Sequence, residues 1–374
     1  MLNLRIIEGY LKGHLVGLES AINRWLGRQF IPRKISTFNI ETSSACNLKC
    51  RFCAYEKKAT PRLSMSNELF RDAVEQAVAL GFREFHLTPT TGDVFMDKRL
   101  FDKLAFLESH PLVESYHFFT NLTIPSREKL LALHSLRKLS RLTISIYGHD
   151  EASFVAITQA DGRIYERLIA NLETILERMG QWPFPISVGF RSTFDVPETD
   201  ASDLMRMLSA LRRKGVGIHA SHGIYNNWGG MISQADVEGL NLRILPAPAA
   251  EKIGPCVKLF DAVQVMATGV VNACSCRDAN ATLKIGDLRE QTLGDILSPG
   301  NAAYLSIIEE QEAGQFRPVC RSCDYYRSIY HQPTNFRRGK IPVQSIDEYF
   351  ASRSVPDTQR DAAKVGAGGT ATGQ

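Results

Sequence analysis

Three cysteines stand close together near the start of the chain, at Cys46, Cys50 and Cys53 in the segment ETSSACNLKCRFCAYEK. Their C-x3-C-x2-C spacing lets one short loop direct three thiolates at the same place, and soft thiolate ligands suit iron–sulfur clusters and zinc alike. A structural zinc site needs four ligands, and residues 54–65 contain no further cysteine or histidine. A four-iron cluster on three thiolates would leave one iron open to bind a substrate or cofactor. A disulfide knot, a zinc site and an iron–sulfur cluster are the alternatives.

The other five cysteines lie in the second half of the chain, at Cys256, Cys274, Cys276, Cys320 and Cys323. The last two form a C-x2-C pair, a spacing that is typical of metal sites. Four thiolates around one zinc ion are one interpretation of this group, and an iron–sulfur cluster is the other.

These cysteines must be positioned by a fold whose pattern is regular from residue 35 onward. We expect strands at 34–42, 83–89, 113–121, 138–148, 185–195 and 215–225, and helices at 65–81, 97–110, 126–136, 164–180 and 201–215. Six strands alternating with helices predict a parallel sheet with its helices outside, as an open doubly wound sheet or a partial barrel. In both folds functional residues gather at the carboxyl ends of the strands, where the first cysteine cluster begins.

Composition predicts an ordinary soluble globular protein. A net charge of +4 is too small for 374 residues to indicate nucleic acid as the main partner. No segment has the ~20 apolar residues of a membrane span. We expect an N-terminal helical extension over 1–35, a core over 36–235, a small C-terminal domain over 236–335, and an extension over 336–374 that is largely a disordered tail.

The N-terminal extension has apolar residues at helical spacing, with Arg5 and Glu8 among them and no small-residue cleavage site, which argues against a signal peptide. We expect a helix packed on the main domain. Contact of this helix with a membrane surface or with a partner protein is the alternative. Without an export signal we expect the protein in the cytoplasm, where thiols stay reduced and clustered cysteines more often bind metal.

The first cluster has Phe52 before Cys53 and follows the first expected strand, and in this it resembles the signature of the radical S-adenosylmethionine (radical SAM) superfamily. The resemblance implies a partial (β/α)6 TIM-like barrel. It also implies that Cys46, Cys50 and Cys53 hold a [4Fe–4S] cluster that binds S-adenosylmethionine.

Further landmarks of that superfamily occur in order along the chain. Thr91-Gly92-Asp93 stands where the family usually has Gly-Gly-Glu, which helps to hold the methionyl amino group, so Thr91 and Asp93 depart from the pattern. By resemblance, the residues around the cofactor would be Phe52, Thr91, Gly92, Asp93, Asn121, Ser145 and Arg191.

The second half of the chain resembles the C-terminal auxiliary-cluster extension known as SPASM, in its shorter twitch form, which has an α+β fold. The resemblance implies one auxiliary [4Fe–4S] cluster, with Cys256, Cys274, Cys320 and Cys323 as ligands. Closed by four thiolates, this cluster would carry electrons rather than bind substrate. Cys276 is then surplus: it could replace Cys274, lie as a thiol near the substrate, or simply be buried.

The resemblance implies reductive cleavage of S-adenosylmethionine to a 5′-deoxyadenosyl radical, which abstracts hydrogen from the substrate. We expect two-electron oxidation of a small polar, sugar- or cyclitol-like substrate with the auxiliary cluster as electron acceptor, and flavodoxin or ferredoxin as reducing partner. A peptide- or protein-modifying maturase of the same superfamily is one alternative, and a zinc-stapled, non-catalytic binding protein is another. The catalytic candidates are Tyr147, His222 and Arg191. Candidate substrate contacts are Tyr55, Asp93, His117, Tyr147, His149, His219, His222, Asn226, Asn227 and Trp228.

Overall fold

The computed structural model describes residues 2–33, 37–88, 90–195, 202–248, 251–261, 263–332 and 341–352, and within 2–13 it describes the course of the helix alone. Most of the predicted disordered tail lies outside the described residues. Residues 341–352 are an exception to that prediction, because β13 (Val343–Gln344) and α13 (Ile346–Ala351) form there. Tyr349 and Phe350 of α13 are buried in the hydrophobic core, which explains why this part of the chain is ordered.

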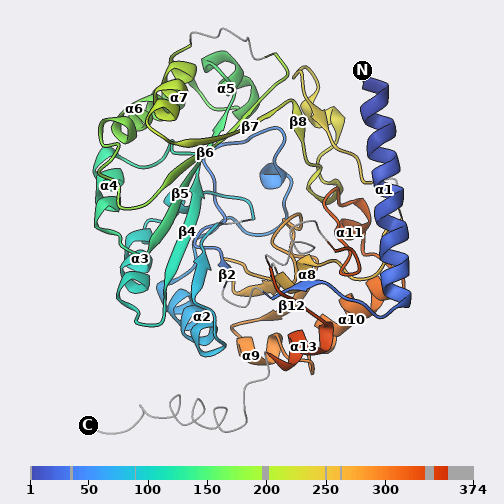
Figure 1. The fold of residues 1–374 in the computed structure, drawn as a ribbon. Coiled ribbons are helices and arrows are strands. Elements are labelled where there is room, and N and C mark those ends of the chain that lie inside the picture. Colours follow the sequence, from blue (N-terminus) through green and yellow to red (C-terminus); the bar gives the residue numbers. More distant parts are fainter. Residues whose placement is uncertain are drawn as a thin grey trace, which may run out of the picture.

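The core of the molecule is a parallel sheet with helices on its outer side (Figure 1). Its strands are β2 (Thr37–Ile40), β3 (Glu84–His86), β4 (Ser115–Thr120), β5 (Leu139–Tyr147), β6 (Ile186–Ser192) and β7 (Gly217–His222). The covering helices are α2 (Asn67–Ala79), α3 (Leu100–Ser109), α4 (Arg127–Ala132), α5 (Glu151–Thr158), α6 (Gly162–Glu177) and α7 (Asp203–Arg213). Each strand pairs in parallel with the next along the chain. The prediction of a partial (β/α)6 barrel is confirmed.

Local sequence explains where the elements begin and end. Ser66 caps α2 by accepting a hydrogen bond from the backbone N–H of Leu69, and Gly81 follows the helix with φ +89°. The predicted strands and helices are present, mostly with shorter bounds, and α6 begins two residues earlier than expected, at Gly162. The separate helix α5 was not expected; the side chain of Asp150 caps it by accepting from the N–H of Ser153.

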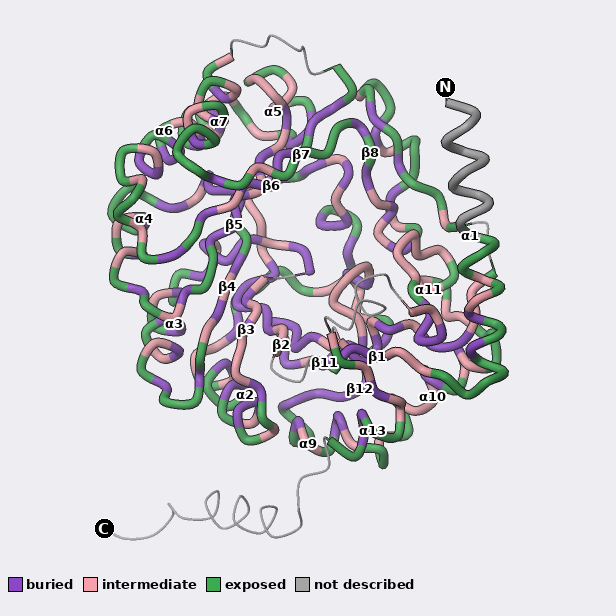
Figure 2. Tube along the Cα trace, viewed as in Figure 1, coloured by how far each residue is buried: buried purple, intermediate pink, exposed green. Residues whose placement is uncertain are grey.

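The sheet has an apolar outer face and a polar inner face. In β5 the side chains of Leu142, Ile144 and Ile146 are fully buried, whereas the alternate residues Ser145 and Tyr147 are partly exposed. Strand side chains alternate between the two faces, so the outer set packs under the helices. The inner set therefore faces the interior of the barrel. Figure 2 shows the buried positions along the strands and the exposed positions on the outer sides of the helices.

The C-terminal region continues the barrel sheet. Strand β10 (Gln264–Val265) pairs in parallel with β2, and β11 (Val270–Asn272) and β12 (Lys284–Asp287) follow in antiparallel order. The helices α9 (Leu293–Ile296) and α10 (Ala302–Glu312) pack on β12, whereas α8 (Lys258–Asp261) lies against β1 (Ile31–Pro32) and α11 (Pro318–Ser322) against residues 228–230. Small pairs complete the fold: β1 with β13, and β8 (Ile224–Tyr225) with β9 (Arg243–Ile244). The predicted domain boundaries stay a prediction.

Helix α1 (Leu2–Trp25) runs along one edge of the molecule, beside the C-terminal elements (Figure 1). The predicted N-terminal helix is therefore present. Among the described residues, none of the helices is both long enough and apolar enough to cross a membrane.

Candidate active site and auxiliary metal centre

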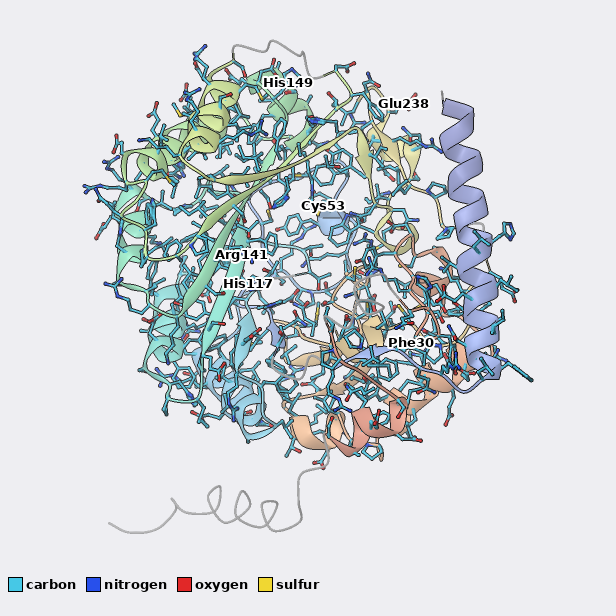
Figure 3. All side chains as sticks on the ribbon, viewed as in Figure 1. Phe30, Cys53, His117, Arg141, His149 and Glu238 are labelled. Atoms are coloured by element: carbon cyan, nitrogen blue, oxygen red, sulfur yellow. The ribbon has the colours of Figure 1, made fainter. Side chains whose placement is uncertain are left out.

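The three clustered cysteines occupy the loop that follows β2, and their side chains line a cavity of about 270 Å³ at the carboxyl ends of the strands. Figure 3 shows Cys53 near the middle of the molecule. All eight cysteines of the chain are free thiols, so the disulfide alternative is wrong. In the described part of the chain, no three Cys, His, Asp or Glu side chains converge closely enough to hold a single metal ion. The three thiols are thus spread around a cavity.

The environment of these thiols fits a positively charged cluster. Burial raises the pKa of Cys46 to about 12 and that of Cys53 to about 11, and it raises the pKa of Cys50 well above its ordinary value. Thiolates buried without a cation are costly, and metal ligation supplies the charge that stabilises them. Cys46 Sγ also accepts a hydrogen bond from Asn121 Nδ2 over 3.8 Å.

The loop after β3 closes tightly on the cysteine loop. Gly92 has φ +141°, and a Cβ atom there would lie 2.9 Å from the carbonyl oxygen of Ser43 and 3.0 Å from that of Ala45. The next residue, Asp93, donates its backbone N–H to the same Ala45 carbonyl over 2.8 Å. Glycine is thus required at this position both by conformation and by space, and the loop forms one wall of the cavity together with Thr91.

The carboxylate of Asp93 is already engaged by protein donors. It accepts hydrogen bonds from the backbone N–H of Asn121 at 2.7 Å, from that of Phe95 at 3.0 Å, and from the hydroxyl of Thr120. Full burial raises the pKa of Asp93 to about 6. Although Asp93 lines the cavity, its carboxylate joins the loop to the end of β4, which differs from a role in holding a methionyl amino group.

Aromatic side chains and Arg191 form another part of the cavity lining. The ring of Phe52 lies against Tyr147 and Tyr225, at centroid distances of 5.2 and 4.5 Å. Arg191 is directly opposite Tyr147 in the β5–β6 register, and both line the cavity together with Ser145. For the Arg191 guanidinium, the described residues provide no hydrogen-bond or ion-pair partner, so it is available to an anionic group. Burial raises the pKa of Tyr147, which keeps its hydroxyl protonated near neutral pH.

Of the other expected contacts, Tyr55, Asn226 and Trp228 line the cavity, and Asn227 does not. The side chain of Asn227 instead accepts from the N–H of Gly229 and donates to the carbonyl of Ser322.

The four expected histidines lie outside the lining of this cavity. His222 is exposed, and its Nδ1 lies 2.7 Å from the hydroxyl of Ser192. His117 packs on His86 lower in the sheet, and His149 precedes α5 (Figure 3). His219 is exposed on the edge strand β7. His222 is therefore not positioned as a catalytic residue of this cavity.

The second group of cysteines lines a smaller cavity of about 30 Å³, formed by Cys256, Cys274, Cys276, Cys320 and Cys323. Burial raises the pKa of Cys256 to about 11 and that of Cys320 to about 12. Their sulfur atoms accept hydrogen bonds from protein N–H groups, as in Gln311 Nε2 to Cys320 at 3.3 Å and Tyr325 N to Cys323 at 3.2 Å. These buried thiols with N–H donors suit an iron–sulfur cluster.

Sequence reasoning missed two cations of this region. Lys252 donates to the carbonyls of Cys320, Arg321 and Cys323, and so fixes the C-x2-C loop. Arg277 lines both cavities. Its position directly after Cys276 was the one available signal in the sequence.

Comparisons with known proteins agree with this geometry. The model of the radical SAM superfamily matches residues 40–220, and that of SPASM, an iron–sulfur cluster-binding domain, matches residues 256–324. No curated protein matches the chain at a significant level.

Solved structures with a similar fold share little sequence with this chain. BtrN in complex with AdoMet and 2-DOIA is 15% identical with a TM-score of 0.50, over 79% of this chain and 96% of BtrN. SuiB of Streptococcus suis bound to S-adenosylmethionine is 13% identical with a TM-score of 0.49, over 76% of this chain and 77% of SuiB. Native anSMEcpe with bound AdoMet is 13% identical with a TM-score of 0.46, over 88% and 99% of the two chains.

Each of the two family matches contains the cysteines of one cavity. The matches favour iron–sulfur clusters over zinc at both groups of cysteines. The chain belongs to the radical SAM superfamily, carries a C-terminal SPASM domain, and has as its cofactors S-adenosylmethionine, a SAM-binding [4Fe–4S] cluster and an auxiliary iron–sulfur cluster.

Proposed function

We propose that this radical SAM enzyme oxidises a small polar alcohol, sugar- or cyclitol-like, by two electrons. When bound, S-adenosylmethionine with its cluster supplies a 5′-deoxyadenosyl radical that removes a hydrogen atom from carbon, and the auxiliary cluster supplies an acceptor for the second electron as the hydroxyl proton leaves. The observation that carries the proposal is the shared wall: Arg277 lines both the cavity of Cys46, Cys50 and Cys53 and the cavity of the other five cysteines.

The residues of the first cavity have complementary roles in this proposal. Cys46, Cys50 and Cys53 hold the SAM-binding cluster, and Phe52 shields it by packing on Tyr147. The Arg191 guanidinium receives the methionyl carboxylate, because it is the cation on this wall without a described partner. The loop at Thr91, Gly92 and Asp93, together with Asn121 and Ser145, completes the pocket.

The substrate would lie between Arg191 and Arg277, where Tyr55, Asn226 and Trp228 also reach the cavity. Tyr147 donates a hydrogen bond from its hydroxyl, since its raised pKa keeps the proton in place. These side chains hold the substrate carbon and exclude water from it.

The auxiliary cluster is assigned to Cys256, Cys274, Cys320 and Cys323, with Cys276 as the fifth thiol of the cavity. We further propose a cytoplasmic protein that is reduced by a flavodoxin or a ferredoxin. A peptide- or protein-modifying maturase of the same superfamily remains the alternative.

The test is anaerobic reconstitution with iron and sulfide, followed by assay with dithionite and S-adenosylmethionine. We expect about eight irons per chain and 5′-deoxyadenosine formation that is lost when Cys46, Cys50 and Cys53 are changed to Ala. Cyclitols, amino sugars and short peptides are then offered in parallel. One ketone per 5′-deoxyadenosine from a cyclitol or sugar supports the proposal; modification of peptides with no oxidation of the alcohols would overturn it.

A further inference from the structure

Helix α1 contacts the body of the protein through its polar side. Ser20 and Asn23 are its buried side chains among residues 14–25, and Asn23 Nδ2 donates to the backbone carbonyl of Tyr330 over 2.9 Å. Arg24 forms an ion pair with Glu312 at the end of α10, with an N–O distance of 2.7 Å. Polar contacts thus hold the helix on the C-terminal domain.

The apolar side of the same helix points away from the body. Leu15, Leu18, Ile22 and Trp25 are exposed by 66, 60, 49 and 84% of their area. Their spacing of three and four residues places them on one face, which we call the apolar stripe of α1. A helix on the surface of a soluble protein normally turns such a stripe toward the core. The reversed arrangement marks an interaction surface.

The charge of the N-terminal segment favours an anionic lipid surface over a second copy of this chain as the partner of the apolar stripe. Residues 1–33 contain five basic side chains, Arg5, Lys12, Arg24, Arg28 and Arg33, against two acidic ones, Glu8 and Glu19. They therefore contribute three of the four net positive charges of the chain. Two of the basic side chains, Arg24 and Arg33, form ion pairs with Glu312 and Glu348. Two copies of this segment would repel each other, whereas an anionic lipid surface would attract it.

We propose that α1 attaches the protein to an anionic lipid surface, with the helix in the plane of the interface and the apolar stripe inserted below the headgroups. A helix of 24 residues is about 36 Å long, and leucine, isoleucine and tryptophan facing lipid, with arginines alongside, are the composition of interfacial helices. Trp25, at the end of the stripe, would lie at headgroup level. This attachment is independent of the proposed reaction.

The experiment uses the full chain with its clusters and vesicles of phosphatidylcholine, with and without phosphatidylglycerol. We expect sedimentation with the anionic vesicles, weaker binding at high salt, and binding reduced about tenfold by Leu18→Asp. Leu112→Asp is the matched control, because Leu112 is 47% exposed elsewhere on the surface and the substitution changes the charge equally. Iron content and melting temperature check that both variants fold.

A second measurement follows the stripe directly. Trp25 fluorescence should shift to shorter wavelength with anionic vesicles, and the shift should be absent in Trp25→Phe. The proposal is overturned if the wild type ignores anionic vesicles at low salt, or if Leu18→Asp binds them as the wild type does. It is also overturned if the wild type is a dimer that Leu18→Asp converts to a monomer, because a second copy would then cover the stripe.

Discussion

Arg277 donates from Nε to Oδ1 of Asp324 over 2.9 Å, and this ion pair joins the two cysteine-bearing loops of the C-terminal domain. Arg277 follows Cys276 and Asp324 follows Cys323. The guanidinium also lies over the ring of Tyr325, with Cζ 5.3 Å from its centroid. Since Arg277 lines both cavities, the pair fixes the wall between them.

Arg277→Lys should disturb the wall between the two cysteine-lined cavities and so impair the oxidation that depends on both. Lysine keeps the charge but cannot reproduce the planar, forked contact with Asp324. We expect the oxidised product formed per 5′-deoxyadenosine to fall several-fold, and the electron paramagnetic resonance signal of the auxiliary cluster to change. Arg321→Lys is the control, because Arg321 is exposed in the same domain. An unchanged product ratio in Arg277→Lys would refute the coupling.

Gly92→Ala should weaken S-adenosylmethionine binding by about tenfold or more, because its Cβ would press on the carbonyls of Ser43 and Ala45. The dissociation constant can be measured by calorimetry on the reconstituted enzyme. Gly81→Ala provides the comparison: Gly81 also has positive φ but open space around it, so it should cost about 1–2 kcal/mol of stability without affecting binding. Equal dissociation constants for the two variants would contradict the assignment of the Gly92 loop.

Cys276→Ser should retain about eight irons per chain, and Cys274→Ser should retain about four. The reason is that Cys274 Sγ accepts the N–H of Cys276 over 3.4 Å, while Cys276 Sγ accepts a hydrogen bond from the Arg277 guanidinium. Iron analysis and spectra of the dithionite-reduced variants check this. The reverse pattern would make Cys276 the ligand.

The lowered pKa of His117 predicts that the stability of the fold depends on pH. Burial, together with the charge of Arg141, lowers the pKa of His117 to about 4. Its ring packs on that of His86 at 3.7 Å between centroids. Because the pKa in the folded state is below the ordinary 6.5, the fold favours the neutral ring, and stability falls as the pH drops from 6.5 toward 4.

At pH 5.5 this effect amounts to about 1 kcal/mol. The melting temperature of His117→Gln should therefore fall less between pH 7.5 and pH 5.5 than that of the wild type. His219→Gln, at an exposed position of β7, should follow the wild type. An equal fall in melting temperature in all three proteins would show that His117 contributes nothing to the pH dependence.

Local signals in the sequence predicted the alternating strands and helices and the first cysteine group, because caps, alternation and the C-x3-C-x2-C spacing are short-range features. The choice of a partial barrel and the set of auxiliary cysteines came from the resemblance to known families. The Arg277–Asp324 pair spans 47 positions, and no local pattern reveals it. His222 lies outside the cavity because side chains alternate between the two faces of a sheet. His222 pairs with Ser192, and both are on the outer face. The preceding pair, Ser221 and Arg191, is on the inner face, toward the cavity. The engagement of Asp93 likewise depends on β4, which is distant in sequence.

One continuous sheet joins the two halves of the molecule, since β10 of the C-terminal domain pairs with β2 of the barrel. The hydrogen bonds between these strands therefore resist a change in the separation of the two halves. Electron tunnelling decreases exponentially with distance, so a rigid spacer makes its rate insensitive to thermal motion. In the proposed reaction, this sheet would keep constant the distance that an electron crosses between the two cysteine-lined cavities.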